Sequence, residues 1–152
     1  MTTIAYDGAT KTIAFDSRAV WGHSVISNKP HMKMREVDGH FFFYAGIASQ
    51  IEAFTDAYFS KEPSEYCDEI SCFVVTPEQL VYCAGTHEDG VVYKDLLTEG
   101  EVYAIGSGYQ FAISALDLGS TPTEAVEYAA TRDLYTGGKV NVFSIDKMEL
   151  VT

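Results

Sequence analysis

Alternating and continuous apolar runs predict that the chain opens with strands. Residues 2–6 ("TTIAY") and 12–16 ("TIAFD") flank an Asp-Gly turn signal, which indicates a hairpin. The first strand begins directly after Met1, without the polar, frayed segment that chain ends usually have. Two explanations are open: an edge strand rich in β-branched residues, or a Thr2 held at a fixed place because it does chemistry.

The pattern changes in the middle of the chain. Residues 19–37 are extended but irregular, and Pro30 excludes a central strand position there. Residues 40–46 ("HFFFYAG") form a near-continuous apolar run, typical of a strand that is buried on both faces. Residues 48–59 ("ASQIEAFTDAYF") have apolar side chains at three- and four-residue spacing, which predicts a helix.

The second half alternates between strands and helices. Three strands are predicted at 69–76, 79–86 and 90–96, and a fourth at 101–108 that ends on glycines. A helix follows at 109–119 and stops at Gly119, and another spans 120–138. Ser120 or Thr121 can cap the latter and Pro122 suits its first turn, while the two glycines at 137–138 are expected to stop it. Strands at 139–145 and 148–151 close the chain.

This order of elements predicts an α+β fold with layered sheets. The 152 residues are enough for one sizeable core, and no linker, repeat or low-complexity stretch divides them. We therefore expect a single domain over residues 1–152.

Charge and composition narrow the function classes. The net charge of −12 repels phosphates and anionic membranes, so nucleic acid and membrane are not expected partners. No apolar run is long enough to span a bilayer, and no secretion leader is recognisable. The three cysteines leave an odd one out for any disulfide scheme, which favours buried thiols in a reducing cytoplasm. The cysteines and the four histidines lack metal-ligand spacing, so neither a metal nor another cofactor is expected.

Few catalytic motifs stand out. Phosphate-binding and dinucleotide-binding loops are absent from the sequence. The Gly106-Ser107-Gly108 segment is by itself most simply a strand-to-helix turn with an N-cap serine. Thr2 is more suggestive, because removal of Met1 would leave a hydroxyl nucleophile with its own α-amine as base. A nearby lysine would lower the pKa of that amine, and a carboxylate would hold the lysine in place.

Six ordered segments make the chain resemble the proteasome β-subunit superfamily, which includes the bacterial HslV peptidase. They are "TTIAYDG", "IAFDSRAVWG", "HMKMREV", "FFFYAGIAS", "YAIGSGYQFA" and "EAVEYAATRDLYTGGKVNVFSI", and together they run the whole length. The resemblance implies an N-terminal nucleophile (Ntn) hydrolase fold, an αββα sandwich with two antiparallel sheets between helical layers. The family has two helices after the Ala-Gly strand, whereas this sequence has room for one, so one helix of that pair is expected to be missing.

The resemblance also assigns site residues. Thr2 would be the nucleophile, Asp16 and Lys33 its activating pair, and Gly46 the oxyanion donor. Ser107, Asp133 and Thr136 would surround the amine; the family more often has serine at the last position. The pocket for the residue before the scissile bond would be lined by Ala19, His31, Tyr44 and Ala48. Without the resemblance, Asp16 would be read as a strand end and Lys33 as a solvated charge.

The implied function is a threonine-type endopeptidase that cleaves polypeptides through an acyl-enzyme ester. The family works as closed rings, so a homo-oligomeric ring or double ring in the cytoplasm is expected, with an ATP-dependent unfoldase as a possible partner. A retained Met1 would turn the amine into an amide, which is no base. Two alternatives therefore stay open: a non-catalytic structural or interfering subunit, and an Ntn amidase that acts on a small molecule.

Overall fold

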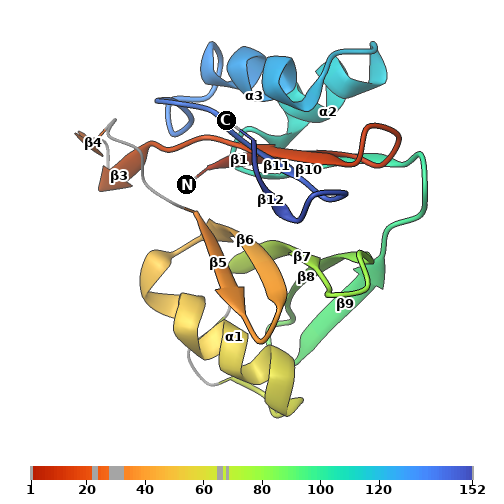
Figure 1. Cartoon of the computed structure of the whole chain (residues 1–152). Helices are drawn as coiled ribbons and strands as arrows, with labels where there is room; N and C mark the ends of the chain where they lie inside the picture. The colour runs from red at the N-terminus through yellow and green to blue at the C-terminus, as the bar shows by residue number, and fades with distance from the viewer. Residues whose placement is uncertain (1, 22–23, 28–32, 65–66, 68, 152) are drawn as a thin grey trace.

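The molecule is built of four layers (Figure 1), in a computed structural model that describes residues 2–21, 24–27, 33–64, 67 and 69–151. Helices α2 and α3 cover one five-stranded sheet, a second five-stranded sheet packs on the other side of the first, and α1 covers the outer face of the second sheet. All strand pairs described are antiparallel. The predicted αββα sandwich is thus confirmed.

The first sheet has the strand order β10-β1-β2-β11-β12 and the second β5-β6-β7-β8-β9, while β3 and β4 pair as a separate ribbon. The elements in chain order are β1 (Thr3–Asp7), β2 (Thr12–Phe15), β3 (Ala19–Trp21), β4 (Ser24–Ser27), β5 (Met34–Val37), β6 (His40–Gly46), the 3₁₀ turn η1 (Ala48–Gln50), α1 (Ile51–Ser60), β7 (Ile70–Val75), β8 (Val81–Thr86), β9 (Val92–Leu96), β10 (Val102–Gly106), α2 (Tyr109–Asp117), α3 (Pro122–Ala130), β11 (Asn141–Ser144) and β12 (Glu149–Leu150).

The first strand is interior, so the edge-strand explanation of the threonine start is wrong. β1 pairs with β2 through the predicted hairpin on one side and with β10 on the other. Its register places Thr3 opposite Gly106 and Asp7 opposite Val102. The start of the chain is therefore fixed by backbone hydrogen bonds on both sides, which leaves Thr2 little freedom.

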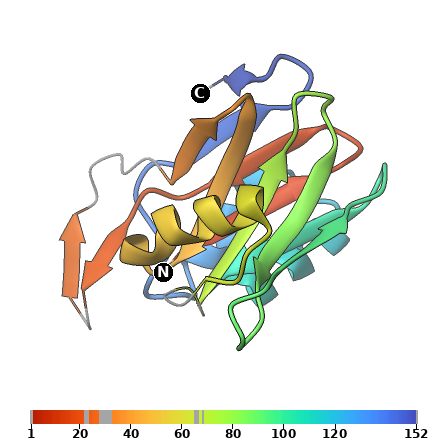
Figure 2. The ribbon, with the colours of Figure 1, turned by 90° about the horizontal axis from the view of Figure 1, so that it is seen from below.

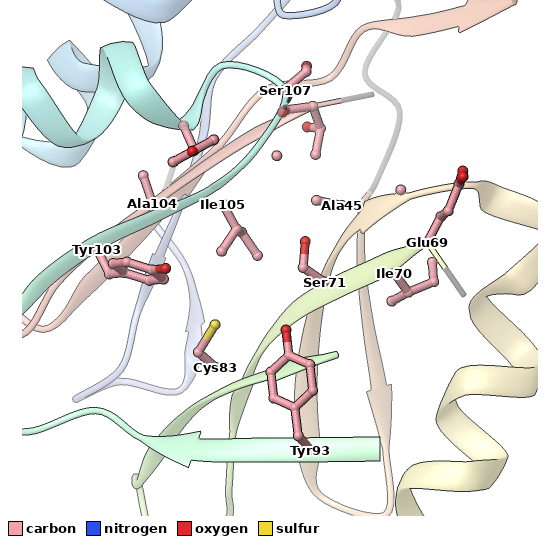
Figure 3. Close-up of a pocket in the computed structure, with 14 residues that line it drawn as sticks. Ala45, Glu69, Ile70, Ser71, Cys83, Tyr93, Tyr103, Ala104, Ile105 and Ser107 are labelled. Atoms are coloured by element: carbon pink, nitrogen blue, oxygen red, sulfur yellow. Dashed lines mark hydrogen bonds between the residues drawn. The ribbon is translucent and has the colours of Figure 1, made fainter. Parts of the chain in front are cut away.

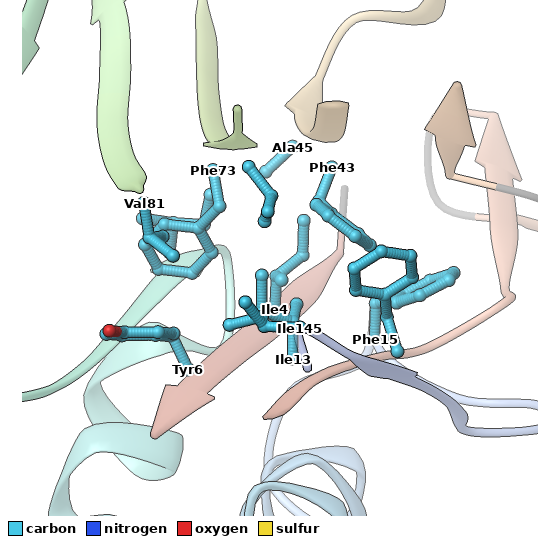
Figure 4. Close-up of a cluster of buried hydrophobic side chains, with 12 residues drawn as sticks. Ile4, Tyr6, Ile13, Phe15, Phe43, Ala45, Phe73, Val81 and Ile145 are labelled. Atoms are coloured by element: carbon cyan, nitrogen blue, oxygen red, sulfur yellow. The ribbon is translucent and has the colours of Figure 1, made fainter. Parts of the chain in front are cut away.

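The main core lies between the two sheets (Figure 4). Alternate residues of each strand face it, because successive side chains of a strand point to opposite faces. Ile4 and Tyr6 of β1 meet Phe43 and Phe73 of the second sheet there, and all four are buried. Phe15 and Phe43 pack edge to face with ring centroids 5.6 Å apart. This shared core fixes the spacing of the two sheets, and the site described below lies between them.

Helix α1 lies diagonally across the second sheet (Figure 2). Between β6 and β7, the described residues form η1 and this one α-helix, in agreement with the predicted loss of a helix. Lys61 ends α1 in the left-handed conformation, with φ of 63°, and donates its N–H to the carbonyl of Ala57.

Helix α3 starts as predicted but ends early. Thr121 is the N-cap and forms a capping box with Glu124, and Pro122 stands in the first turn. The helix stops at Ala130, well before the glycines at 137–138 that were expected to end it. The reason is Asp133, whose carboxylate accepts hydrogen bonds from Tyr135 N and from Thr136 Oγ1 and so competes with helical pairing.

Candidate active site

The two threonines at the start of the chain face opposite ways. Thr3 points toward the helical layer, where its Oγ1 lies 2.6 Å from Thr136 Oγ1. Thr2 shares the opposite face with Ile4 and lines a pocket between the sheets. The alternation of a strand thus gives the two adjacent hydroxyls separate surroundings.

Thr2, Asp16 and Lys33 meet at one point. Lys33 Nζ lies 2.7 Å from Thr2 Oγ1 and 2.8 Å from Asp16 Oδ1. Thr2 Oγ1 also donates a hydrogen bond to Asp16 Oδ1. Asp16 is 0 % exposed, Thr2 is 1 % exposed and the Lys33 side chain is 12 % exposed, so the ion pair is shielded from water. The reading of Lys33 as a solvated surface charge does not fit this placement.

The Asp16 carboxylate is held from several sides. Oδ1 accepts a hydrogen bond from Thr3 N at 3.2 Å, and Oδ2 accepts one from Gly137 N at 2.9 Å. The Arg18 guanidinium packs on Gly137, and a Cβ there would lie 2.4 Å from the guanidinium carbon, so a side chain at this position would require Arg18 to move. The carboxylate is therefore oriented by main-chain donors and keeps Oδ1 toward Lys33.

Burial and the neighbouring charge shift the pKa of Lys33 in opposite directions. Removal from water lowers the pKa of the Lys33 ammonium, and the adjacent Asp16 carboxylate partly restores it. The Lys33 carbonyl is anchored as well, since it accepts a hydrogen bond from Tyr44 N at 3.0 Å. Lys33 therefore reaches from the second sheet across to Thr2 of the first.

A second polar group adjoins the main chain of Thr2. Ser107 Oγ donates to Asp133 Oδ2 at 2.6 Å and lies 3.3 Å from the Thr2 carbonyl oxygen. Thr136 Oγ1 donates to the same Asp133 oxygen at 2.6 Å. Ser107 is not the N-cap of α2, contrary to the simplest reading of its motif: Gly108 holds that position, with no side-chain cap.

Two glycines make this packing possible. Gly106 has φ of +96°, and a Cβ there would lie 2.0 Å from the Thr2 carbonyl oxygen. Gly46 has φ of +135°, and a Cβ there would lie 2.0 Å from the Glu69 carbonyl oxygen. Both positions exclude other L-residues, because the conformation and the space both require glycine. Gly46 lines the same pocket as Thr2.

The pocket has a volume of about 420 Å³ (Figure 3). It is lined by Thr2, Gly46 and Ser107, and also by residues that the sequence did not single out: Ser71, Cys83, Tyr93, Tyr103 and Ile105. These come from β7, β8, β9 and β10. The sequence predicted these segments as strands, but it did not show the pairing of distant strands that brings the residues together.

The four predicted substrate-pocket residues are not among the described lining residues of this pocket. Tyr44 lies on the opposite face of β6, where it is 3 % exposed and its hydroxyl is 2.5 Å from Thr55 Oγ1 of α1. Ala19 is half-buried in β3, and Ala48 is exposed in η1. His31 lies outside the described residues. A role for these four in substrate binding stays a prediction.

No group of three or more His, Cys, Asp or Glu side chains within the described ranges is placed to hold a metal ion. Among the described helices, none has the length and apolar character needed to cross a membrane.

Comparison with known proteins identifies the fold. No protein-family model and no curated protein matches the chain. Solved structures do match: BPH of Thiobacillus denitrificans, in complex with epoxomicin, has a TM-score of 0.65 at 18% identity, over 93% of this chain and 97% of that one. The eukaryotic HslV of Trypanosoma brucei has a TM-score of 0.65 at 20% identity, with the same coverage. The chain therefore has the HslV-like Ntn-hydrolase fold.

Proposed function

We propose that this chain is an N-terminal threonine peptidase that cleaves peptide bonds through an acyl-enzyme ester. The observation that carries the proposal is the contact of Lys33 Nζ with both Thr2 Oγ1 and Asp16 Oδ1, at 2.7 and 2.8 Å. A nucleophile, a cation and an orienting carboxylate are thus in mutual contact inside a pocket, which is the arrangement that covalent catalysis requires.

The reaction needs a free α-amine on Thr2, and hydrolytic removal of Met1 supplies it. The amine takes the proton of the Thr2 hydroxyl while Oγ1 bonds to the carbonyl carbon of the substrate. The adjacent Lys33 cation lowers the pKa of this amine and stabilises negative charge that develops on Oγ1. The N–H of Gly46 is assigned to the carbonyl oxygen as it becomes negative.

Collapse of this intermediate breaks the peptide C–N bond. The protonated amine gives its proton to the departing nitrogen, and an ester between Thr2 and the acyl part remains. The amine then takes a proton from a water molecule, whose oxygen attacks the ester carbon, and the acid product leaves with Thr2 Oγ1 protonated again. Ser107, Asp133 and Thr136 position the amine from the main-chain side of Thr2.

We also propose that copies of this chain assemble into a closed ring. The resemblance implies a homo-oligomeric ring or double ring that encloses the sites and admits unfolded polypeptides in the cytoplasm, with an ATP-dependent unfoldase as partner. Sedimentation at micromolar concentration is expected to show a closed oligomer. A monomer would contradict the ring and favour an amidase with a small-molecule substrate.

The test of the proposed function combines mass spectrometry with a peptidase assay. We expect the purified protein to begin at Thr2, to hydrolyse unfolded polypeptides, and to lose this activity in Thr2→Ala. Thr10→Ala is the matched control, since Thr10 is exposed in the β1–β2 turn. If Met1 is retained and hydrolysis is absent, the chain is a non-catalytic subunit and the proposed function is wrong.

A further inference from the structure

The pocket beside Thr2 runs along the open edge of the sandwich. β10 is an edge strand of the first sheet and β9 is an edge strand of the second, and side chains from both line it. Figure 3 shows Ser107 at one end of the pocket and Tyr93 at the other, with Tyr103 on the left side of the view. A ligand that reaches Thr2 through this space contacts both sheets.

The pocket lies on one side of the nucleophile. Lys33 and Asp16 contact the hydroxyl of Thr2, and neither is among the described lining residues. Gly106 and Ser107, which contact the main chain of Thr2, do line it. The atom that they contact is the Thr2 carbonyl oxygen, so the pocket lies on the main-chain side of Thr2, away from Lys33 and Asp16. The mechanism above places Ser107, which lines the pocket, beside the amine that protonates the departing nitrogen, so the leaving part of the substrate lies on this side.

Apart from Glu69, the described lining of the pocket is apolar or uncharged. Burial raises the pKa of the Cys83 thiol to about 11 and also raises the pKa of the Tyr93 and Tyr103 hydroxyls. Glu69 is the charged side chain among the described residues that line the pocket, and it is exposed. A substrate carboxylate would lose its hydration here without gaining a cationic partner, whereas an aromatic or aliphatic side chain would gain apolar contact.

The far wall of the pocket is fixed by a glycine. Tyr93 stands directly opposite Gly85 in the β8–β9 pair, and a Cβ at Gly85 would lie 2.6 Å from the Tyr93 hydroxyl oxygen. The ring therefore lies against the bare backbone of β8. A larger residue at position 85 would have to displace the Tyr93 hydroxyl, which lines the pocket.

We propose that this pocket selects the substrate residue that follows the scissile bond, accepting apolar, preferably aromatic, side chains and rejecting acidic ones. The inference rests on the proposed function, since it takes Thr2 as the nucleophile. Tyr93, Tyr103 and Ile105 form its walls, and Ser71, which points into the space in Figure 3, forms its floor.

The test uses three quenched fluorescent peptides that differ in the residue after the cleaved bond: Phe, Gly or Glu. The parent is expected to cleave the Phe peptide ~10-fold or more faster than the Gly peptide in kcat/KM, the scale of apolar pocket discrimination. The Glu peptide is expected to be the slowest. Ser71→Leu fills the space and should reduce the Phe-to-Gly ratio ~10-fold. Ser114→Leu makes the same change on an exposed face of α2 and should keep the parental ratio.

Equal kcat/KM values for the Phe and Glu peptides in the parent would overturn the proposal. So would a Ser71→Leu variant in which kcat/KM falls by the same factor for the Phe and Gly peptides. If thermal unfolding shows that Ser71→Leu does not fold, Tyr103→Ala replaces it. Tyr103 is partly exposed, so its removal leaves the core intact, and loss of this wall should also lower the Phe preference ~10-fold.

Failure of the proposed function gives a different result. If the parent cleaves none of the peptides, binding is measured by calorimetry with Phe-Gly amide and Glu-Gly amide, which correspond to the leaving parts. Binding of the Phe compound that Ser71→Leu weakens supports the pocket even in an inactive chain. Equal binding of both compounds, or binding of neither, overturns the pocket assignment.

Discussion

The two helical layers of the sandwich are built from different side chains. Between the first sheet and helices α2 and α3, the buried cluster is mostly alanine: Ala5, Ala14, Ala104, Ala112, Ala115, Ala125 and Ala129, with Leu116 and Val126. Between the second sheet and α1, the cluster is aromatic and larger: Phe42, Tyr44, Phe54 and Tyr58, with Cys67, Ile70, Cys72, Val74 and Ala84.

The alanine layer serves the site. Small side chains allow helices and strands to approach closely, and closely packed elements move little relative to one another. The turn before α2 carries Ser107, and the turn after α3 carries Asp133 and Thr136. The Asp133 N–H donates to the carbonyl of Ala129 at 2.7 Å, so the polar group continues directly from the alanine layer.

The aromatic layer covers a sheet with one helix. Phe54 of α1 is fully buried and packs edge to face on Tyr44, with ring centroids 6.3 Å apart, and Tyr58 packs on Phe42 at 5.2 Å. Large rings let a single helix bury more of the sheet than alanines would. The difference indicates that the side that carries the candidate site depends on close positioning, while the α1 side depends on buried area.

The largest expected effect is on the aromatic side. Phe54→Ala removes a fully buried ring and should lower the free energy of unfolding by about 3–5 kcal/mol. Phe59→Ala, at a partly exposed position of the same helix, should lower the free energy of unfolding much less. Chemical denaturation measures both. A loss below ~1 kcal/mol for Phe54→Ala would mean that the aromatic layer is not tightly packed.

The next largest effect is expected at Lys33, where a substitution tests the chemistry of the site and not its packing. Lys33→Ala should lower peptidase activity by ~10²-fold or more, because the cation beside Thr2 Oγ1 is lost. Lys33→Arg should rescue poorly, since a planar guanidinium does not replace a compact ammonium, and Asp16→Asn should also lower activity. Lys94→Ala, whose ammonium lies over the Tyr58 ring on the α1 side, is the matched control. Activity retained in Lys33→Ala would contradict the assigned role.

A third substitution tests whether close packing supports the site. Ala129→Leu should overpack the alanine layer, lowering stability by about 1–3 kcal/mol, and should also reduce kcat by displacing Asp133. Ala57→Leu makes the same change in α1, where Ala57 is buried. It is expected to alter stability with little change in kcat. Equal losses of kcat in both variants would remove the distinction between the two layers.

The smallest effect concerns pH. Burial raises the pKa of Tyr58 from 10.0 to about 12, while the described alanine cluster contains no ionisable side chain. The stability from burying this neutral phenol is fully present below pH 10, where both states are protonated, and is lost as the pH rises toward 12. From about pH 8 to about pH 11, the free energy of unfolding should therefore fall by about 1 kcal/mol less in Tyr58→Phe than in the parent. Denaturation curves of both proteins at the two pH values measure this difference. An equal fall in the free energy of unfolding for Tyr58→Phe and the parent would contradict the prediction.

Local sequence signals predicted most elements. The turn glycines, the Thr121 cap with Pro122, and the apolar run before Gly46 placed strands and helices close to their observed positions. The end of α3 was missed because the carboxylate of Asp133 forms a competing turn, which helix propensity does not register. Thr2 stood out by its place directly after Met1, whereas Asp16 and Lys33 were selected through the resemblance, since spacing along the chain does not show which side chains meet.

Local patterns along the chain were enough for most of the order of elements, for the single helix after Gly46 and for a strand that ends on glycines near 106. The tertiary structure alone decided that β1 is an interior strand, that Tyr44 faces α1, and that Cys83 and Tyr103 share a pocket with Thr2. The physical reason is that local propensity acts over a few residues, whereas these contacts join strands that lie far apart in the chain. Their pairing is chosen by the burial of both sheet faces together.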